Sequence, residues 1–186
     1  MLSIYRLPNH LPGEEVKMIV RRDLFVLFKQ ILMLMFLIIL PLIFFYLMLV
    51  TRPGILENQT AYALIVLGTS AYYLFIWLFF FFSFVDYYLD VWIVTNRRII
   101  DIQQRGFFSR VISEQKLFRV QDVTSEVHGF LPTIFKYGDV HIQTAGAKQR
   151  FLFHEVPDPN GVRDAIIRLV EHNKKKMVQE AKIENI

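Results

Sequence analysis

Two uncharged stretches in the first half of the chain, Ile31–Val50 and Ala61–Val85, restrict its fold more than any other feature. Neither contains an Asp, Glu, Lys, Arg or His residue. A helix rises about 1.5 Å per residue, so about twenty residues reach across the roughly 30 Å hydrocarbon core of a bilayer. A surface helix of a soluble protein would carry a polar face over that length. The pattern therefore predicts two transmembrane helices joined by the short connector Thr51–Thr60.

Basic residues flank the two stretches, whereas the connector contains only Arg52. The flanking basic residues are Lys17, Arg21, Arg22 and Lys29 before the first stretch, and Arg97, Arg98 and Arg105 after the second. Lys and Arg favour the cytoplasmic side of a membrane. We therefore predict a multi-pass protein of the cytoplasmic membrane, with both termini in the cytoplasm and the lipid bilayer as its first partner.

The chain divides by composition into three parts. These are a cytoplasmic lead-in segment (1–30), a two-helix transmembrane hairpin (31–85) and a cytoplasmic domain with its own core (86–186). In the lead-in, Val16, Ile19 and Val20 recur at helical spacing, which favours a short helix at the interface. Arg21 and Arg22 would then lie at headgroup depth, either as a plain positive-inside signal or as a specific lipid site.

The cytoplasmic part alternates apolar and polar residues like a small β domain. The expected strands are Tyr88–Val94, Ile99–Ile102, Arg110–Gln115, Val120–Val127, Asp139–Thr144 and Arg150–Val156. Turns are expected at Gly106 and at residues 145–147. An amphipathic helix should follow, with Asp158 as its N-cap and Pro159 in its first turn. Six or seven strands and one helix indicate a small barrel or sandwich closed at one end by that helix.

Three aromatic residues follow the second uncharged stretch closely: Tyr87, Tyr88 and Trp92. Tyr and Trp are enriched where a membrane meets water. We therefore expect these three side chains in the aromatic belt at the cytoplasmic interface.

The sequence contains no recognisable catalytic or metal-binding motif. The absence of cysteine excludes disulfides, thiolate metal sites and a thiol nucleophile. His128, His141 and His154 recur every thirteen residues but lack the pairing of a metal site, so we expect no metal and no cofactor. No GxSxG elbow, glycine-rich phosphate loop, zinc-finger spacing or RNP motif is present. The chain is therefore expected to be neither an enzyme nor a nucleic-acid-binding protein.

An ordered series of short motifs carries a family resemblance. It consists of Ile93–Ile100 (IVTNRRII), Gly106, Val120–Val123 (VQDV), Tyr137–Ile142 (YGDVHI) and Thr144–Gly146 (TAG). The series resembles the bacterial pleckstrin-homology-like (PH-like) domain family, whose membrane-attached members often place two spans before the domain. The segment ending in Arg21-Arg22 is also similar to that of such members, although Asp23 stands where a histidine is expected. The resemblance implies a membrane α-helical hairpin and a mainly β, split, seven-stranded barrel capped by a C-terminal helix. It implies no common enzymatic activity.

Four arginines are the candidate lipid- or phosphate-binding residues: Arg21, Arg22, Arg97 and Arg98. Arg97 and Arg98 follow a strand that begins at the membrane, so they could contact anionic headgroups. They could equally be solvated, or paired with Asp101 or Asp122. Both interpretations stay open on the sequence alone.

These patterns together predict a membrane-anchored, non-enzymatic binding or scaffolding module at the cytoplasmic membrane face. It would recognise a protein partner, a second copy of itself in a homo-oligomer, or anionic lipid. The alternatives are a small membrane enzyme and an accessory subunit of a transport or envelope complex.

Overall fold

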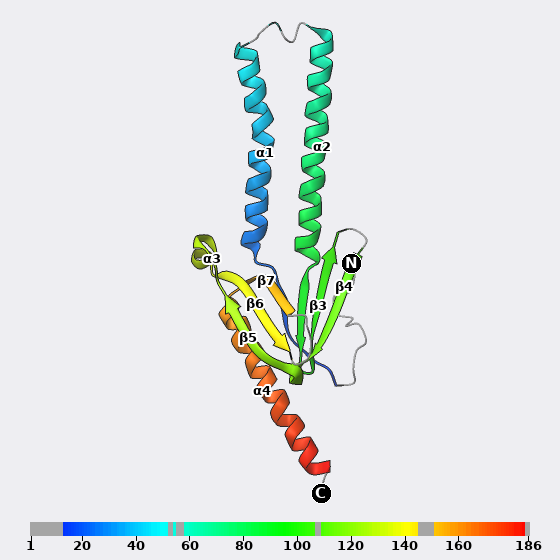
Figure 1. The fold of residues 1–186 in the computed structure, drawn as a ribbon, viewed down its shortest axis with the longest axis vertical. Helices are drawn as coiled ribbons and strands as arrows, with labels where there is room; N and C mark the ends of the chain where they lie inside the picture. Colours follow the sequence, from blue (N-terminus) through cyan, green and yellow to red (C-terminus); the bar gives the residue numbers. More distant parts are fainter. Residues whose placement is uncertain (1–12, 52–53, 55–57, 107–108, 145–150, 185–186) are drawn as a thin grey trace. The chain divides into compact units, whose positions relative to one another are not determined.

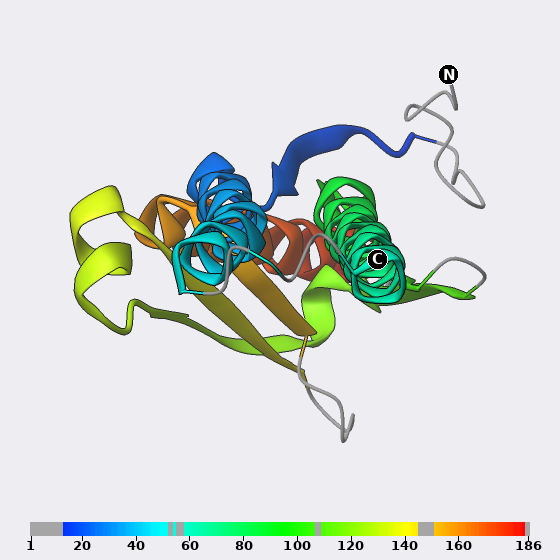
Figure 2. The ribbon, with the colours of Figure 1, turned by 90° about the horizontal axis from the view of Figure 1, so that it is seen from above.

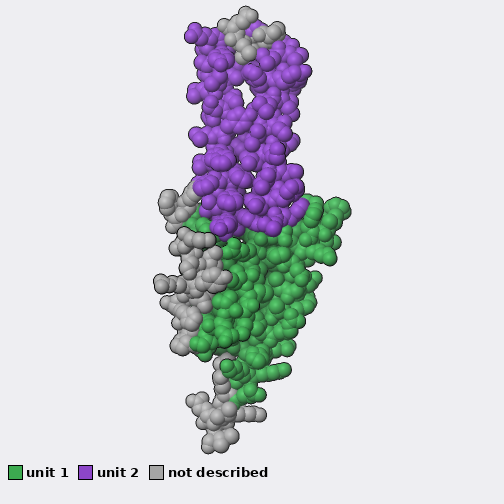
Figure 3. All heavy atoms as spheres, turned by 180° about the vertical axis from the view of Figure 1, so that it is seen from behind, with its two compact units in different colours: residues 1–23, 89–186 green, residues 24–88 purple. Residues whose placement is uncertain are grey.

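The computed structural model describes residues 13–51, 54, 58–106, 109–144 and 151–184. The chain forms two compact units, coloured separately in Figure 3. Unit 1 comprises residues 1–23 and 89–186, and unit 2 comprises residues 24–88. The turn expected at residues 145–147 and the expected strand start at residue 150 lie outside the described residues.

Unit 2 is a helical hairpin made of α1 (Leu24–Thr51) and most of α2 (Gln59–Leu89) (Figure 1). Both helices are long and apolar enough to cross a membrane, since they measure about 42 and 46 Å at 1.5 Å per residue. The strand predicted from residue 88 is wrong at its start, because α2 continues through Tyr87 and Tyr88. The β propensity of aromatic residues is weak and yields here to an established helix.

Pro41 lies inside α1 and removes one backbone donor from it. The carbonyl four residues earlier, at Leu37, therefore lacks its usual helical partner. The Tyr72 hydroxyl on α2 donates to this Leu37 oxygen at 3.0 Å, and the Tyr73 hydroxyl donates to the Ile38 oxygen at 3.1 Å. The second helix thus satisfies the backbone group that the proline frees.

Unit 1 contains two antiparallel sheets (Figure 1). The first has the order β1-β2-β3-β4, and the second has the order β5-β6-β7. The strands are β1 (Val16–Arg21), β2 (Val91–Thr95), β3 (Arg98–Arg105), β4 (Ser109–Lys116), β5 (Val120–Glu126), β6 (Tyr137–Thr144) and β7 (Phe151–Pro157). The 3-10 turn η2 (Leu117–Arg119) joins the sheets, and α3 (Phe130–Phe135) joins β5 to β6. Viewed from above, β1 (blue) and α3 (yellow-green) lie on different sides of unit 1 (Figure 2).

The helix α4 (Pro159–Glu184) completes unit 1 and packs against β5, β6 and η2. Its start follows the predicted cap, because the Asp158 carboxylate accepts from the Gly161 backbone N–H at 3.1 Å. Ile166 and Val170 from the predicted apolar stripe are buried in the core. The expected fold class is therefore confirmed: two long apolar helices, a split barrel of antiparallel strands and a capping C-terminal helix.

The seventh strand comes from the lead-in segment, which corrects the expectation of an interfacial helix there. Residues 16–21 form β1, which pairs antiparallel with β2 and places Arg21 opposite Val91. Six residues are too few for helical and alternating spacing to be told apart. The alternation puts Met18 and Val20 against the core while Ile19 points to the other face. The lead-in is therefore part of unit 1, the same unit that contains the residues after the hairpin.

Trp92 lies in the centre of the main core and not at a membrane interface, which corrects the prediction for this residue. It is fully buried, and its ring stacks on Phe153 with centroids 5.1 Å apart. Because α2 extends to Leu89, Trp92 is the second residue of β2, and the strand alternation directs it inward. Tyr87 is half-buried and Tyr88 is exposed in the last turns of α2, and the interface prediction for these two stays a prediction.

Candidate functional site

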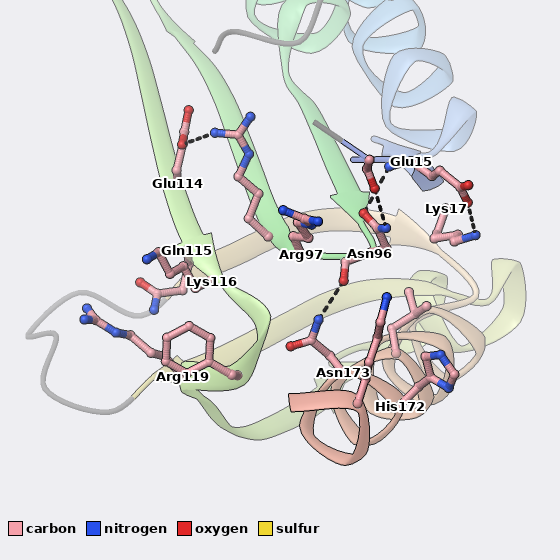
Figure 4. Close-up of a pocket in the computed structure, with 15 residues that line it drawn as sticks. Glu15, Lys17, Asn96, Arg97, Glu114, Gln115, Lys116, Arg119, His172 and Asn173 are labelled. Atoms are coloured by element: carbon pink, nitrogen blue, oxygen red, sulfur yellow. Dashed lines mark hydrogen bonds and ion pairs between the residues drawn. The ribbon is translucent and has the colours of Figure 1, made fainter. Parts of the chain in front are cut away.

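A pocket of about 920 Å³ opens at one end of unit 1 (Figure 4). It lies where the β2–β3 turn, the end of β4, η2, α4 and the segment before β1 meet. Its lining residues are Gly13, Glu15, Lys17, Asn96, Arg97, Arg98, Glu114, Gln115, Lys116, Phe118, Arg119, Leu169, His172, Asn173 and Lys176. The volume falls within the range of small-molecule pockets.

Asn96 positions the segments that form the pocket. Its side-chain oxygen accepts from the Glu15 backbone N–H, and its side-chain nitrogen donates to the Gly13 oxygen, both at 3.0 Å. The Asn173 side chain on α4 donates to the Asn96 backbone oxygen at 2.7 Å. Asn96 therefore joins the segment before β1 to the C-terminal helix.

Arg98 lines the pocket and is buried. Its Nε and Nη2 atoms donate to the two Glu14 carboxylate oxygens at 2.8 and 2.9 Å, and Nη1 donates to Glu114 at 2.5 Å. The hydrogen bond to Glu14 is the main reason why the pKa of Arg98 is raised, while burial opposes the shift. The Thr95 hydroxyl donates to Glu14 as well, at 2.9 Å.

These contacts correct two expectations for Arg98. Its partners are Glu14 and Glu114 rather than Asp101 or Asp122. Only 7% of its side chain is exposed, so a lipid headgroup cannot reach the guanidinium. Arg98 is therefore a structural residue that holds the segment before β1 against β3.

Glu15 and Lys17 form an exposed pair at the rim, with their charged atoms 2.6 Å apart. The hydrogen bond from Lys17, then the positive charge of Lys17 and, to a smaller degree, that of Lys176 lower the pKa of Glu15. The carboxylate at the rim is therefore charged at neutral pH and already compensated by a neighbouring cation.

Four cations of the pocket are exposed and keep their charge available: Arg97, Lys116, Arg119 and Lys176. Within the part of the chain that the structure describes, none of the four forms an ion pair with a carboxylate. Phe118 lies between two of them, with Lys116 and Arg119 at 5.8 and 5.9 Å from its ring centroid. An aromatic ring beside unpaired cations suits an anionic ligand that also has an apolar part.

The other two candidate arginines do not belong to this pocket. Arg21 is exposed on β1, opposite Val91 at the start of β2, whereas the pocket lies beyond the end of β2 at Thr95. Arg22 is bound to Asp90 with charged atoms 2.5 Å apart. The four arginines therefore do not form a single site, and only Arg97 has an exposed side chain in the pocket.

The three regularly spaced histidines are divided between two carboxylates. His128 and His141 lie 3.1 and 3.5 Å from Glu126, while His154 lies 3.9 Å from Asp139. Among the described residues, no group of three or more His, Asp or Glu side chains is arranged to hold a metal ion.

Sequence reasoning missed Glu14 and three of the four pocket cations: Lys116, Arg119 and Lys176. Lys116 and Arg119 flank Phe118 in the sequence, which is a detectable basic–aromatic cluster. The three lysines at 174–176 also stand out in the sequence, but only the fold brings Lys176 to the same pocket. Nothing in the sequence pairs Glu14 with a residue 84 positions later.

Known proteins similar to this chain include a solved structure and a protein family. A crystal structure of a DUF1696 family protein with a pleckstrin-homology domain from Shewanella loihica PV-4 is similar to 44% of this chain and 70% of its own, with 17% identity and a TM-score of 0.36. The comparison with curated proteins found no match. Residues 24–170 match the family described as Bacterial PH domain. This match covers both apolar helices, β2 to β7 and the first half of α4, and the chain therefore belongs to the bacterial PH domain family.

Proposed function

We propose that this protein is a membrane-anchored binding module whose basic pocket receives an acidic segment of a partner protein. The single observation that carries the proposal is a pocket lined by four exposed cations without ion pairs, two of which, Lys116 and Arg119, lie close to the Phe118 ring. A binding module is also the role that a PH-like domain supports. The hairpin supplies the anchor in this proposal, because its helices display large apolar side chains outward, with Phe36, Leu67 and Leu74 67–71% exposed.

The strand pairing supports one topology for the anchor. β1 precedes the hairpin and β2 follows it, yet Arg21 and Val91 are partners in one sheet. Two hydrogen-bonded strands cannot lie on opposite sides of a bilayer. Both ends of the hairpin therefore lie on the same side in this proposal, and the distribution of Lys and Arg favours the cytoplasm.

The position of the pocket favours a protein segment over a lipid headgroup. β2 follows α2 almost at once, and its five residues lead to the Asn96–Arg97 turn at the pocket. A strand of that length spans about 16 Å. The pocket cations are thus a full strand away from the point where the chain leaves α2. An acidic peptide with an apolar side chain for Phe118 would fit both the charge and the lining of the pocket.

Photo-crosslinking in cells that produce the full chain tests the proposal. A photoreactive amino acid at Gln115, which lines the pocket, should yield a protein adduct. Charge reversal by Arg97→Glu and Arg119→Glu should abolish that adduct. The matched control is the same photoreactive residue at Thr124, which is exposed on β5 away from the pocket, with no adduct expected.

A different crosslinking pattern would reject the pocket as a partner site. Lipid adducts at Gln115 would favour headgroup binding, and adducts between copies of the chain would favour a homo-oligomer. Equal protein adducts from Gln115 and Thr124, insensitive to charge reversal, would indicate random collision.

No observation on the described residues favours the enzymatic alternative. The two carboxylates that line the pocket, Glu15 and Glu114, are each bound to a cation. We therefore do not propose a catalytic activity for the pocket.

A further inference from the structure

The short helix α3 collects exposed apolar side chains in a small area. Phe130 is 78% exposed, Ile134 53%, Phe135 49% and Leu131 43%. They come from one helix of six residues in which no residue is buried. A protein surface seldom gathers so many large apolar groups unless the patch contacts a partner or a membrane.

The conformation of α3 is well defined by its own hydrogen bonds. The Thr133 hydroxyl and backbone N–H both donate to the Gly129 oxygen, at 2.7 and 3.3 Å. At the other end, Lys136 takes a left-handed conformation and its N–H bonds to the Pro132 oxygen. The helix therefore presents its apolar side chains from a fixed backbone and not from an irregular loop.

Strand pairing fixes the end of unit 1 to which α3 is attached. α3 leads directly into Tyr137, the first residue of β6, which is paired with Pro157 at the end of β7. The backbone N–H of Asp158 also donates to the Lys136 oxygen at 2.9 Å. α3 thus lies where β6 begins and β7 ends.

At this same end of unit 1 the chain leaves for the hairpin and returns from it (Figure 1). Glu155, two residues before the end of β7, accepts through its backbone oxygen from the N–H of Asp23 at 2.7 Å. Asp23 is the residue before α1. Its neighbour Arg22 binds Asp90, the residue after α2, with charged atoms 2.5 Å apart. The end of β7 and the residue after it therefore bond to the residue before α1 and to the end of α3, and Arg22 links this end to the residue after α2.

On the basis of the membrane anchoring proposed above, we propose that α3 inserts into the interfacial layer of the bilayer as a third membrane contact. A lipid surface is the occupant because the end of unit 1 that carries α3 is also the end continuous with both proposed spans. Interfacial segments bury their apolar side chains about 5–10 Å into the boundary between headgroups and acyl chains. Lys136 is exposed next to α3 and would meet anionic headgroups.

The absence of cysteine permits a direct test, because each introduced cysteine carries the only label. Full-length Phe130→Cys and Ile134→Cys variants are labelled with an environment-sensitive fluorophore and reconstituted into phosphatidylcholine–phosphatidylglycerol vesicles containing nitroxide lipids. Leu67→Cys, 69% exposed on α2, reports on the span, and Lys116→Cys reports on the opposite end of unit 1. Emission of the buried Trp92, recorded in a Trp77→Phe background, shows that each variant is folded.

Quenching by nitroxides placed near the headgroups should be roughly twofold or more stronger at Phe130 and Ile134 than at Lys116. A second outcome is quenching at Leu67 while quenching at Phe130 and Ile134 does not exceed that at Lys116. This outcome would overturn the role of α3 but preserve the anchor. Absence of quenching at Leu67, Phe130 and Ile134 together would overturn both the anchor and the role of α3. If a protein partner covers α3 instead of lipid, the expected result is quenching at Leu67 without added quenching at Phe130 and Ile134.

Discussion

Arg98 on β3 holds the Glu14 carboxylate through two hydrogen bonds of 2.8 and 2.9 Å, across 84 positions of sequence and the entire hairpin. The Glu14 side chain is completely buried, and that of Arg98 is 7% exposed. The pair therefore fixes the segment before β1 to a strand that is made only after both apolar helices.

Arg98→Met should destabilise unit 1 strongly. Removal of one partner from a buried ion pair leaves an uncompensated charge and costs about 3–5 kcal/mol. The melting temperature of the full chain, followed by Trp92 emission in a Trp77→Phe background, should fall by roughly 10 °C or more. The matched control is Arg97→Met, an exposed neighbour whose loss should change stability by no more than about 0.5 kcal/mol. Equal effects of the two substitutions would contradict the buried pair.

The two tryptophans should respond differently to lipid. Trp77→Phe leaves Trp92 as the remaining tryptophan, and Trp92→Phe leaves Trp77. Trp92 is fully buried against Phe153, whereas Trp77 is 63% exposed on α2. In vesicles containing brominated lipids, we expect quenching of Trp77 and none of Trp92. Quenching of Trp92 would restore the aromatic-belt interpretation for that residue.

The pKa of the Glu15 carboxyl group should depend more on Lys17 than on Lys176. Lys17 contributes both a hydrogen bond and its charge to the lowered pKa of Glu15, and Lys176 contributes its charge alone. A lowered pKa means that the carboxylate stabilises the fold fully above its ordinary value of 4.5, and this contribution is lost as the pH falls through the folded pKa. In an NMR titration of the Glu15 carboxyl carbon, Lys17→Gln should raise the pKa toward 4.5 more than Lys176→Gln does. The reverse order would show that the pair is not formed in solution.

Tyr72→Phe should weaken the hairpin, because it leaves the Leu37 carbonyl next to Pro41 without its donor. Hydrogen bonds between membrane helices contribute about 0.6 kcal/mol on average and about 1.7 at most. Thermal unfolding of the helices in detergent, measured by circular dichroism, should shift accordingly. Tyr62→Phe provides the comparison, since Tyr62 lies on the same helix and is 53% exposed. A Tyr72→Phe variant as stable as Tyr62→Phe would exclude this role of the hydroxyl.

Local patterns explain how much of the fold could be predicted. The uncharged stretches, the strands after the hairpin and the cap at Asp158 each depend on neighbouring residues, and all are present in the structure. β1 was missed because a six-residue apolar pattern fits a helix as well as a strand until its partner is known. That partner, β2, lies on the far side of the hairpin.

The candidate site was less predictable because its geometry is non-local. Arg97 and Arg98 are adjacent in the sequence and looked equivalent, yet one is exposed in the pocket and the other is buried. The choice depends on Glu14 and Glu114, which approach only through the β1–β2 and β3–β4 pairings. Likewise, Trp92 was misplaced because the exact end of α2 decides which face of β2 it occupies.

β1 is synthesised before the hairpin, and the other three strands of its sheet are synthesised after it. Synthesis therefore separates β1 in time from its partner β2. At about 5–20 residues per second, several seconds pass before β1 can find its partner. During that interval Val16, Met18 and Val20 form an unpaired strand near the ribosome, exposed to wrong pairings. Unit 1 can complete its first sheet only after both helices have been synthesised. A folded unit 1 therefore indicates that synthesis of the hairpin is complete. With the hairpin anchored in a membrane as proposed, substitutions that delay its insertion should therefore appear first as misfolding of the β domain.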